Sequence, residues 1–482
     1  MLAQAVMLVV PNQSNMIKKI IKLSIFVAIL IIALLVRKAN YAQVPVPGQS
    51  VDEYSYSWVG LSLIETGMPV GISGIPGYKN IINRYINVDR FFQVVSTGDP
   101  LTLNYPWMDH PPLLGLITGG YAYLSGARVF EDTTALLIRR PIIIIGVVSV
   151  ALAFIFCWLN FGYLSAVLVG SIYATTPLVV LSSRMIQAEN AIIPCLLFTM
   201  IALSQYFRSK KDFWLLLVSL SSGLATLFKL SGFVCHLLVF FSLIAYYKSI
   251  NKSLVKDLSF FLIISLPITF LYIIYGLSYD PQTLKNILFS NYNRFYGIGP
   301  SLIFDLITRQ RLTQHKFLPE VWIIMSWFIL FFFLLKKRIN ISQKISILAP
   351  LSYLVIYILF GSQPYGWYAF PFWPLLFILL AQFLSSDFQN LKHFLLSFII
   401  LVTIFGENIF RIIGVGGFQP YASIWRLSLS GLLLTFIFLQ ITKVKFITPK
   451  RIVLLIIFLL SIYTNIKYLQ MINIDFWWQN VS

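Results

Sequence analysis

The chain has 482 residues, of which 58% are hydrophobic and only 11% are charged, against about 25% charged residues in soluble domains, so a soluble globular protein is excluded. Lys and Arg number 36 and Asp and Glu number 17, which gives a net charge of +19. In a membrane protein this excess is expected from basic cytoplasmic loops that contact anionic lipid, so it does not require a nucleic-acid partner.

The N-terminus does not resemble an ordinary signal peptide. Residues 1–15, MLAQAVMLVVPNQSN, have no basic start, and a Lys-rich segment beginning at Met16 follows them. We therefore expect residues 1–19 to be a cytoplasmic segment with an over-extended start, so that translation begins at Met16. Residues 20–482 are expected to form a single membrane domain.

The predicted fold is an all-α integral membrane protein. About thirteen apolar stretches follow one another, each near the length of about 20 residues that a spanning helix needs. They lie near residues 20–36, 141–158, 162–181, 191–207, 213–228, 232–247, 258–277, 321–335, 345–361, 367–384, 394–412, 424–441 and 452–469. With a cytoplasmic N-terminus, nearly every inner loop carries positive charge, as the positive-inside rule requires.

Two long segments, 37–140 and 278–320, fall on the outer side. Within the first, residues 54–66 are predicted to form an amphipathic helix, and the apolar stretch 111–125 is too short for a span. Counting 111–125 as a span would also place the basic loop 336–344 outside. We therefore expect both to be interfacial helices at the outer membrane surface.

Charged residues differ between the two sides. Only three of the 17 acids, Asp212, Asp257 and Asp387, fall on the inner side. Lys predominates inside and Arg outside, and the planar fork of donors on Arg suits phosphate or carboxylate groups. This distribution predicts an anionic ligand, a phosphate, handled at the outer surface.

Two motifs in the first outer segment bear candidate chemistry. Asp52 and Glu53 precede the predicted helix, where carboxylates stabilise a helix N-terminus or take a proton from an acceptor hydroxyl. Asp109 and His110 stand before Pro111 and Pro112, and such a pair forms a surface turn, binds phosphate, or binds a metal with a third ligand.

Five basic or acidic residues at predicted membrane boundaries are further candidates. Arg184 and Glu189 lie in a short outer loop, and Lys229 follows an apolar stretch. Charges at such positions are costly and mark functional sites by default, although an ion pair or a snorkelling lysine would serve equally. Arg139 and Arg140 stand outside against the positive-inside rule, which asks for a functional reason.

These motifs, in this order, resemble the polyprenyl-phosphate-dependent glycosyltransferases of the GT-C fold, the superfamily of protein O-mannosyltransferases and lipid A aminoarabinose transferases. The resemblance covers residues 20–390. It implies that Asp52, the acid of the first outer loop, is the catalytic base or binds the acceptor. It also implies that His110, the basic residue before Pro-Pro, helps hold the lipid phosphate, while Glu189 departs from the more usual Asp.

In the aminoarabinose-transferase branch a loop histidine and an acid before the basic-Pro motif hold zinc, and by position these are His315 and Asp109. A divalent metal is therefore the one cofactor considered, against a plain exposed loop histidine. Tyr365, in an aromatic outer turn, is an interface-belt residue or stacks on a sugar.

The sequence thus predicts a membrane glycosyltransferase that moves a sugar from a polyprenyl-phosphate donor to a hydroxyl acceptor on a lipid, glycan or protein, with inversion, at the extracytoplasmic face. The alternative is a non-catalytic transporter or flippase of lipid-linked glycans, which would place ionisable groups near the membrane midplane. The expected catalytic residues are Asp52, Glu53 and Glu189, and the expected substrate-binding residues are His110, Arg139, Arg140, Arg184, Lys229 and Tyr365.

Overall fold

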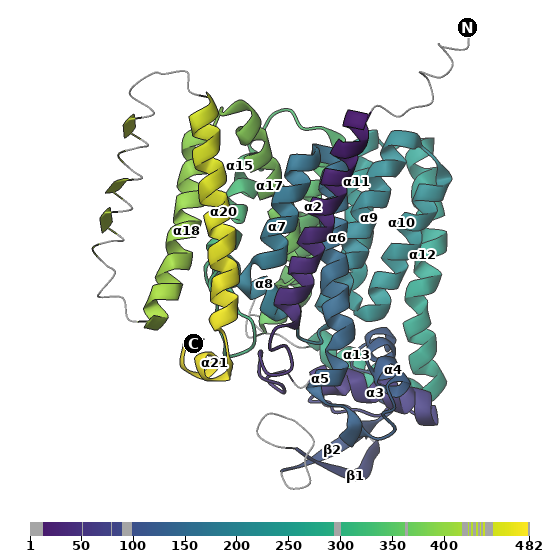
Figure 1. Cartoon of the computed structure of the whole chain (residues 1–482). Coiled ribbons are helices and arrows are strands. Elements are labelled where there is room, and N and C mark those ends of the chain that lie inside the picture. Colours follow the sequence, from purple (N-terminus) through teal and green to yellow (C-terminus); the bar gives the residue numbers. More distant parts are fainter. Residues whose placement is uncertain are drawn as a thin grey trace, which may run out of the picture.

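The computed structural model is a bundle of long helices with short helices and one β-hairpin gathered at one end (Figure 1). It describes residues 13–482 except 51, 79, 89–98, 294–299, 362–364, most of 417–446, and 481–482. The expectation that translation begins at Met16 concerns residues 1–12, and the predicted span 424–441 falls within the gap at 417–446. Both lie outside the described residues.

The bundle follows the predicted order of apolar stretches. Its helices are α2 (Gln13–Lys38), α6 (Arg140–Phe161), α7 (Tyr163–Thr175), α9 (Ala188–Ser209), α10 (Asp212–Phe228), α11 (Val234–Tyr247), α12 (Lys252–Tyr279), α15 (Val321–Leu334), α16 (Ile341–Phe360), α17 (Phe372–Asn390), α18 (Phe394–Gly416) and α20 (Ile447–Met471). Every predicted span outside 424–441 coincides with one of them. The predicted fold class is confirmed.

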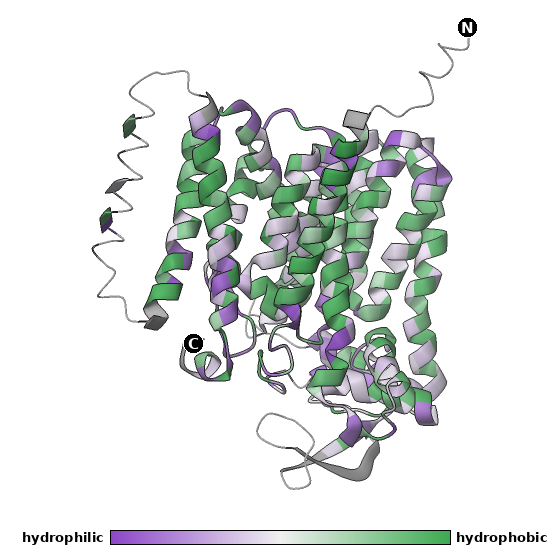
Figure 2. Ribbon diagram, viewed as in Figure 1, coloured by the Kyte–Doolittle hydropathy of each residue, from purple (hydrophilic) through white to green (hydrophobic). Residues whose placement is uncertain are grey.

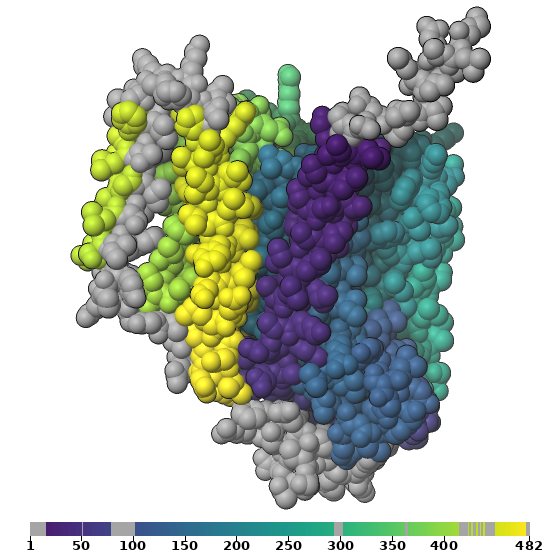
Figure 3. Space-filling view, viewed as in Figure 1, coloured from purple at the N-terminus to yellow at the C-terminus, as the bar shows by residue number. Residues whose placement is uncertain are grey.

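Within the described residues, nine segments are long and apolar enough to cross a membrane, and α7, α10 and α15 are shorter apolar helices. Apolar residues cover the helices while hydrophilic ones gather at both ends (Figure 2). On the face shown in Figure 3, α2 and α20 run along the surface. Ile31 on α2 and Leu459 on α20 are more than half exposed there, as expected of side chains that contact lipid.

The two ends of the bundle differ in character. The loop-rich end carries α3 (Asp52–Thr66), α4 (Leu113–Leu124), α5 (Ala135–Ile138), α13 (Pro281–Asn293) and the hairpin (Figure 1). The lysine-rich end holds the turns that join α9 to α10, α11 to α12, α15 to α16, and α17 to α18, which are the predicted inner loops.

The helix α3 corrects one prediction. It was expected to be an amphipathic surface helix, but all its residues from Glu53 to Ser62 are buried. The reason is that α4 packs directly on it through glycines, and Gly60 and Gly115 bring the two backbones into contact. A helix of 12 residues, such as α4, is about 18 Å long, well short of the ~30 Å of a bilayer core.

The hairpin was not predicted. Strand β1 (Asn80–Val88) pairs antiparallel with β2 (Asp99–Tyr105), with Asn80 opposite Tyr105 and an irregularity between Ile82 and Ile86. The backbone of Gly71 also exchanges two hydrogen bonds with Asn104 on β2. The hairpin therefore continues into the backbone that leads to the Asp109–His110 motif.

The contact between α3 and α4 predicts a sharp difference between two neighbouring glycines. In Gly119→Ala, the new Cβ would lie 2.3 Å from the backbone nitrogen of Leu61 and 2.5 Å from the carbonyl oxygen of Ser57. Because backbone atoms cannot yield locally, we expect a loss of about 1–3 kcal/mol and a lower Tm of the detergent-purified protein. Gly120→Ala is the control, since its nearest neighbour is Ile64 Cδ1 at 3.4 Å. Equal Tm values would contradict the close helix contact.

Candidate active site

The predicted site residues come together at the loop-rich end from segments far apart in the chain. Asp52 and Glu53 begin α3, and His110 lies just before α4. Glu189 stands in the first turn of α9. Lys229 follows α10 in an extended conformation. These segments surround one buried polar region.

A buried ion pair joins Glu53 to Arg139. Arg139 Nε lies 2.6 Å from Glu53 Oε1, and Nη2 lies 2.8 Å from Oε2, while both side chains are at most 1% exposed. The remaining donor group, Nη1, donates to the carbonyl oxygens of Tyr41 and Pro45, each at 2.7 Å. A bidentate pair of this kind is geometrically fixed. Glu53 and Arg139 therefore hold α3 and the preceding loop against the start of α6.

Arg184 is a second buried arginine that binds backbone. Its Nη1 donates to the carbonyl oxygen of Val44 at 2.8 Å, and its Nη2 donates to that of Val36 at 2.7 Å. Burial, with repulsion from Arg139 and Arg37, lowers the pKa of Arg184 to about 9. The side chain therefore fixes the loop after α2.

Glu189 and Lys229 form a second buried ion pair, with Nζ 2.6 Å from Oε1. The ammonium group also lies 4.3 Å from the ring centre of Tyr368. Burial lowers the pKa of Lys229, but attraction to Glu189, Tyr368 and Asp52 together with the hydrogen bond to Glu189 outweighs it, so the pKa lies above its usual value and the side chain stays cationic. Glu189 Oε2 is buried without a partner among the described residues. That oxygen is an acceptor for a ligand or water.

Tyr56, one turn into α3, connects these groups to His110. Its ring stacks on the His110 imidazole with centroids 5.6 Å apart. Burial, together with the carboxylates of Asp52 and Glu189, raises the pKa of its hydroxyl well above the usual value. The hydroxyl thus remains protonated, and within the described part of the chain it has no hydrogen-bond partner. It is a donor available to a ligand, and sequence reasoning did not single it out.

The Asp109 carboxylate is held by the loop that precedes the hairpin. It accepts hydrogen bonds from Ser73 Oγ at 2.8 Å and from Tyr78 OH at 2.6 Å. Burial and this carboxylate raise the pKa of Tyr78, which keeps it a donor. From the bundle, Tyr272 on α12 donates to the carbonyl oxygen of Met108 at 2.8 Å. The motif is therefore a rigid turn.

The two residues of the metal prediction, Asp109 and His315, lie in different surroundings. Asp109 is engaged by Ser73 and Tyr78, and His315 is exposed in the loop between α14 (Pro300–Thr308) and α15. Over the residues that the structure describes, no three or more His, Cys, Asp or Glu side chains are placed to hold a metal ion.

Arg140 and Tyr365 lie at the edge of the region. Arg140 is exposed, and its Nε donates to the hydroxyl of Tyr41 at 3.2 Å, so it does not share the buried environment of Arg139. Tyr365 stacks on Trp367 with ring centres 4.9 Å apart. Its neighbour Tyr368 is the ring that covers Lys229.

Sequence reasoning missed a third buried ion pair. Arg411 on α18 donates from Nη1 to Glu320 Oε1 at 3.0 Å, and the same oxygen accepts from the backbone of Leu178 at 3.3 Å. Burial raises the pKa of Glu320 despite the attraction of Arg411. Leu178 belongs to α8 (Pro177–Ser182), which leads to Arg184. The signal available in the sequence was Glu320, an acidic residue directly before an apolar stretch.

The environments of two adjacent arginines predict different stabilities. Arg139→Met leaves the Glu53 carboxylate buried without its partner, a change that typically costs about 3–5 kcal/mol. Arg140→Met, the matched control, removes an exposed side chain and should leave the Tm of the purified protein within about 1–2 °C. The double variant E53L/R139M removes both charges and is expected to recover most of the loss. If E53L/R139M had a Tm no higher than that of Arg139→Met, this would contradict the proposed cost of leaving the Glu53 carboxylate buried without its partner.

Comparison with known proteins supports the fold. Residues 109–273 match the family described as dolichyl-phosphate-mannose-protein mannosyltransferase. No curated protein sequence matches the chain. Among solved structures, ArnT from Cupriavidus metallidurans bound to undecaprenyl phosphate has a TM-score of 0.54 and 12% identity, over 92% of this chain and 77% of ArnT.

Two longer proteins share the same architecture. The apo oligosaccharyltransferase of Archaeoglobus fulgidus has a TM-score of 0.50 and 12% identity, over 77% of this chain and 51% of its own. The arabinosyltransferase EmbB from Mycobacterium smegmatis has a TM-score of 0.50 and 13% identity, over 91% of this chain and 40% of its own. The predicted resemblance is confirmed: the chain is a membrane protein with the fold of the GT-C glycosyltransferases.

Proposed function

We propose that this protein is a membrane glycosyltransferase that moves a sugar from a polyprenyl-phosphate carrier to a hydroxyl group of an acceptor. The observation that carries this proposal is the polar region at the loop-rich end, where Asp52 begins α3 and the Lys229 ammonium is held in a buried ion pair with Glu189. A carboxylate and a fixed cation are the two groups that such a transfer needs, at the acceptor and at the departing phosphate. The shared fold and the match over residues 109–273 agree with it.

In the proposed reaction, Asp52 is the base. The acceptor oxygen attacks the anomeric carbon from the face opposite the phosphate, and its proton passes to the Asp52 carboxylate. The bond between the anomeric carbon and the phosphate oxygen breaks, and the lipid phosphate leaves with that electron pair. Inversion follows from this single displacement. Glu53, paired with Arg139, fixes the backbone that carries Asp52, so its proposed role becomes positioning.

The departing phosphate requires positive charge that is already in place. Lys229 supplies it, and Glu189 keeps the ammonium ionised and oriented. His110, stacked on Tyr56, is the proposed second contact to the phosphate. Arg184 contributes indirectly, because it holds the loop that contains Val44. Arg140 is exposed and is available to bind the lipid carrier near the membrane surface. The Tyr365–Trp367 stack offers a ring face for the sugar.

Replacing the proposed base should remove activity without unfolding the protein. In Asp52→Asn, we expect transfer from a synthetic polyprenyl-phosphate sugar to fall by about 10²–10⁴-fold, because the amide cannot accept the proton. Glu65→Gln is the matched control, since Glu65 lies at the other end of α3 and pairs only weakly with Arg128 at 4.0 Å. Product formation by purified protein is followed by mass spectrometry, with Tm as the measure of folding.

Each outcome of this assay bears on the proposal. Full activity in Asp52→Asn would refute Asp52 as the base. If the folded wild-type protein transferred no sugar from any of a panel of polyprenyl-phosphate donors, the transferase would be refuted in favour of a transporter of lipid-linked glycans.

We further propose that the N-terminus and the lysine-rich end are cytoplasmic and that the site faces the extracytoplasmic side. Gln314 and Lys337 are exposed at the loop-rich and lysine-rich ends, and the three native cysteines are buried or half-buried. A membrane-impermeant maleimide should therefore label Gln314→Cys in intact cells and label Lys337→Cys only after permeabilisation. The reverse pattern would contradict the proposed orientation.

A further inference from the structure

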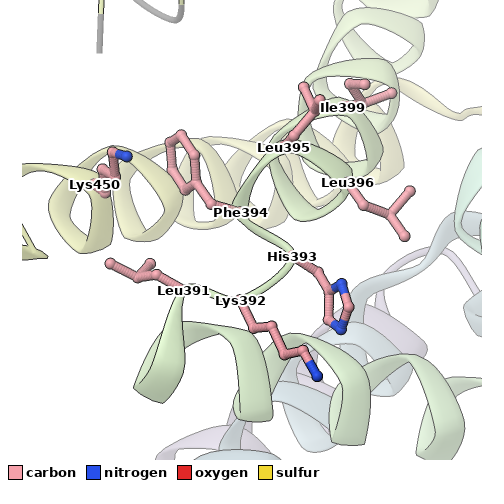
Figure 4. Close-up of a pocket in the computed structure, with 8 residues that line it drawn as sticks. All are labelled: Leu391, Lys392, His393, Phe394, Leu395, Leu396, Ile399 and Lys450. Carbon is pink, nitrogen blue, oxygen red and sulfur yellow. The ribbon is translucent and has the colours of Figure 1, made fainter. Parts of the chain in front are cut away.

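The lysine-rich end holds a cavity that the proposed reaction does not use. It has a volume of about 530 Å³ and lies where α17 turns into α18, beside the start of α20 (Figure 4). Its lining consists of Leu391, Lys392, His393, Phe394, Leu395, Leu396, Ile399 and Lys450. A volume of roughly 300–1,000 Å³ is typical of sites for small ligands.

The polar part of this cavity is basic. Lys392 and His393 contribute to its lining from the turn between α17 and α18, and Lys450 contributes from the first turn of α20. Lys450 Nζ lies 5.2 Å from the ring centre of Phe394, so this ammonium is held beside the cavity wall. None of the described residues that line it is acidic. The first turn of α18 adds the positive end of a long helix to the same charge.

The rest of the lining is apolar and continues along α18. Leu395 and Ile399 are one turn apart on the same face of the helix, and they are 43% and 48% exposed. In Figure 4 they follow the basic turn along the helix, and α18 is largely hydrophobic (Figure 2). A ligand that fits both parts has an anionic head and a hydrocarbon tail.

We propose that this cavity binds the phosphate of an anionic phospholipid, with an acyl chain lying along Leu395 and Ile399. The charge selects an anionic headgroup over a zwitterionic one because the lining offers cations without a carboxylate to receive a choline or ethanolamine group. The apolar wall selects a lipid over a soluble phosphate. The cavity lies at the opposite end of the bundle from Asp52 and Lys229, so the proposal is independent of the proposed reaction.

The test is native mass spectrometry of the full-length, delipidated protein titrated with phosphatidylglycerol or phosphatidylcholine. Wild-type protein should retain phosphatidylglycerol preferentially. In K392Q/K450Q this retention should fall by about fivefold for each lysine, the contribution expected of a lysine at an anionic lipid surface. The matched control K336Q/K337Q removes two exposed lysines from the neighbouring turn between α15 and α16 and should retain the lipid as wild type does.

A second variant tests the cavity itself without altering the lysines. Leu395→Glu places a carboxylate on an exposed position of the wall and should abolish the preference for phosphatidylglycerol. Wild-type retention in K392Q/K450Q, or equal retention of both lipids by wild-type protein, would overturn the proposal. Displacement of phosphatidylglycerol by millimolar inorganic phosphate would overturn it in favour of a soluble anion.

Discussion

The loop-rich end depends on the buried ion pair between Glu53 and Arg139. From the start of α6, the arginine donates to two other segments at once: the Glu53 carboxylate at the start of α3 and the loop carbonyls of Tyr41 and Pro45. Burying two charges is favourable only when geometry and additional hydrogen bonds are nearly ideal, and here both conditions hold. The pair converts a loop into a rigid support, and Asp52 is the residue immediately before it.

The other polar contacts extend the same constraint. Arg184 fixes the loop carbonyl of Val44, and Lys229 is fixed by Glu189. In each case a long cationic side chain loses its freedom to a specific acceptor, so the positive charge is in place before any ligand arrives. Such preorganisation is what stabilises charge that develops during a reaction. It also gives the buried arginines of the loop-rich end a structural role.

The sequence predicted the bundle well because each span depends on local apolar character, which is readable from a single stretch of chain. The predictions failed where contacts with other parts of the chain determine the structure of a segment. The segment DEYSYSWVGLSLIET, with its serines and acids, looks like a surface helix, yet it packs closely on Gly115 and Gly119 of another helix and is buried from Glu53 to Ser62. The hairpin escaped notice because the mixed residues of NIINRYINV do not alternate cleanly between apolar and polar.

The candidate site was predicted in composition but not in its pairings. Its charged residues were identified from motifs, whereas the partner of each one is set by tertiary contacts. Tyr56 and Tyr78 received no attention because a tyrosine beside a membrane is ordinarily an interface residue. Only burial next to carboxylates distinguishes them.

The distances along the chain between these partners set an order of assembly. Arg139, the partner of Glu53, lies 86 residues later in the chain. Arg184, which donates to the carbonyl oxygen of Val36, lies 148 residues after Val36. While the protein is being synthesised, α3 is therefore made long before the helices that anchor it. During that interval its carboxylates remain hydrated. The support for Asp52 is complete only after the segment that carries Arg184 and α9 has joined the bundle. A chain interrupted earlier contains Asp52, Glu53 and His110 but has no formed site.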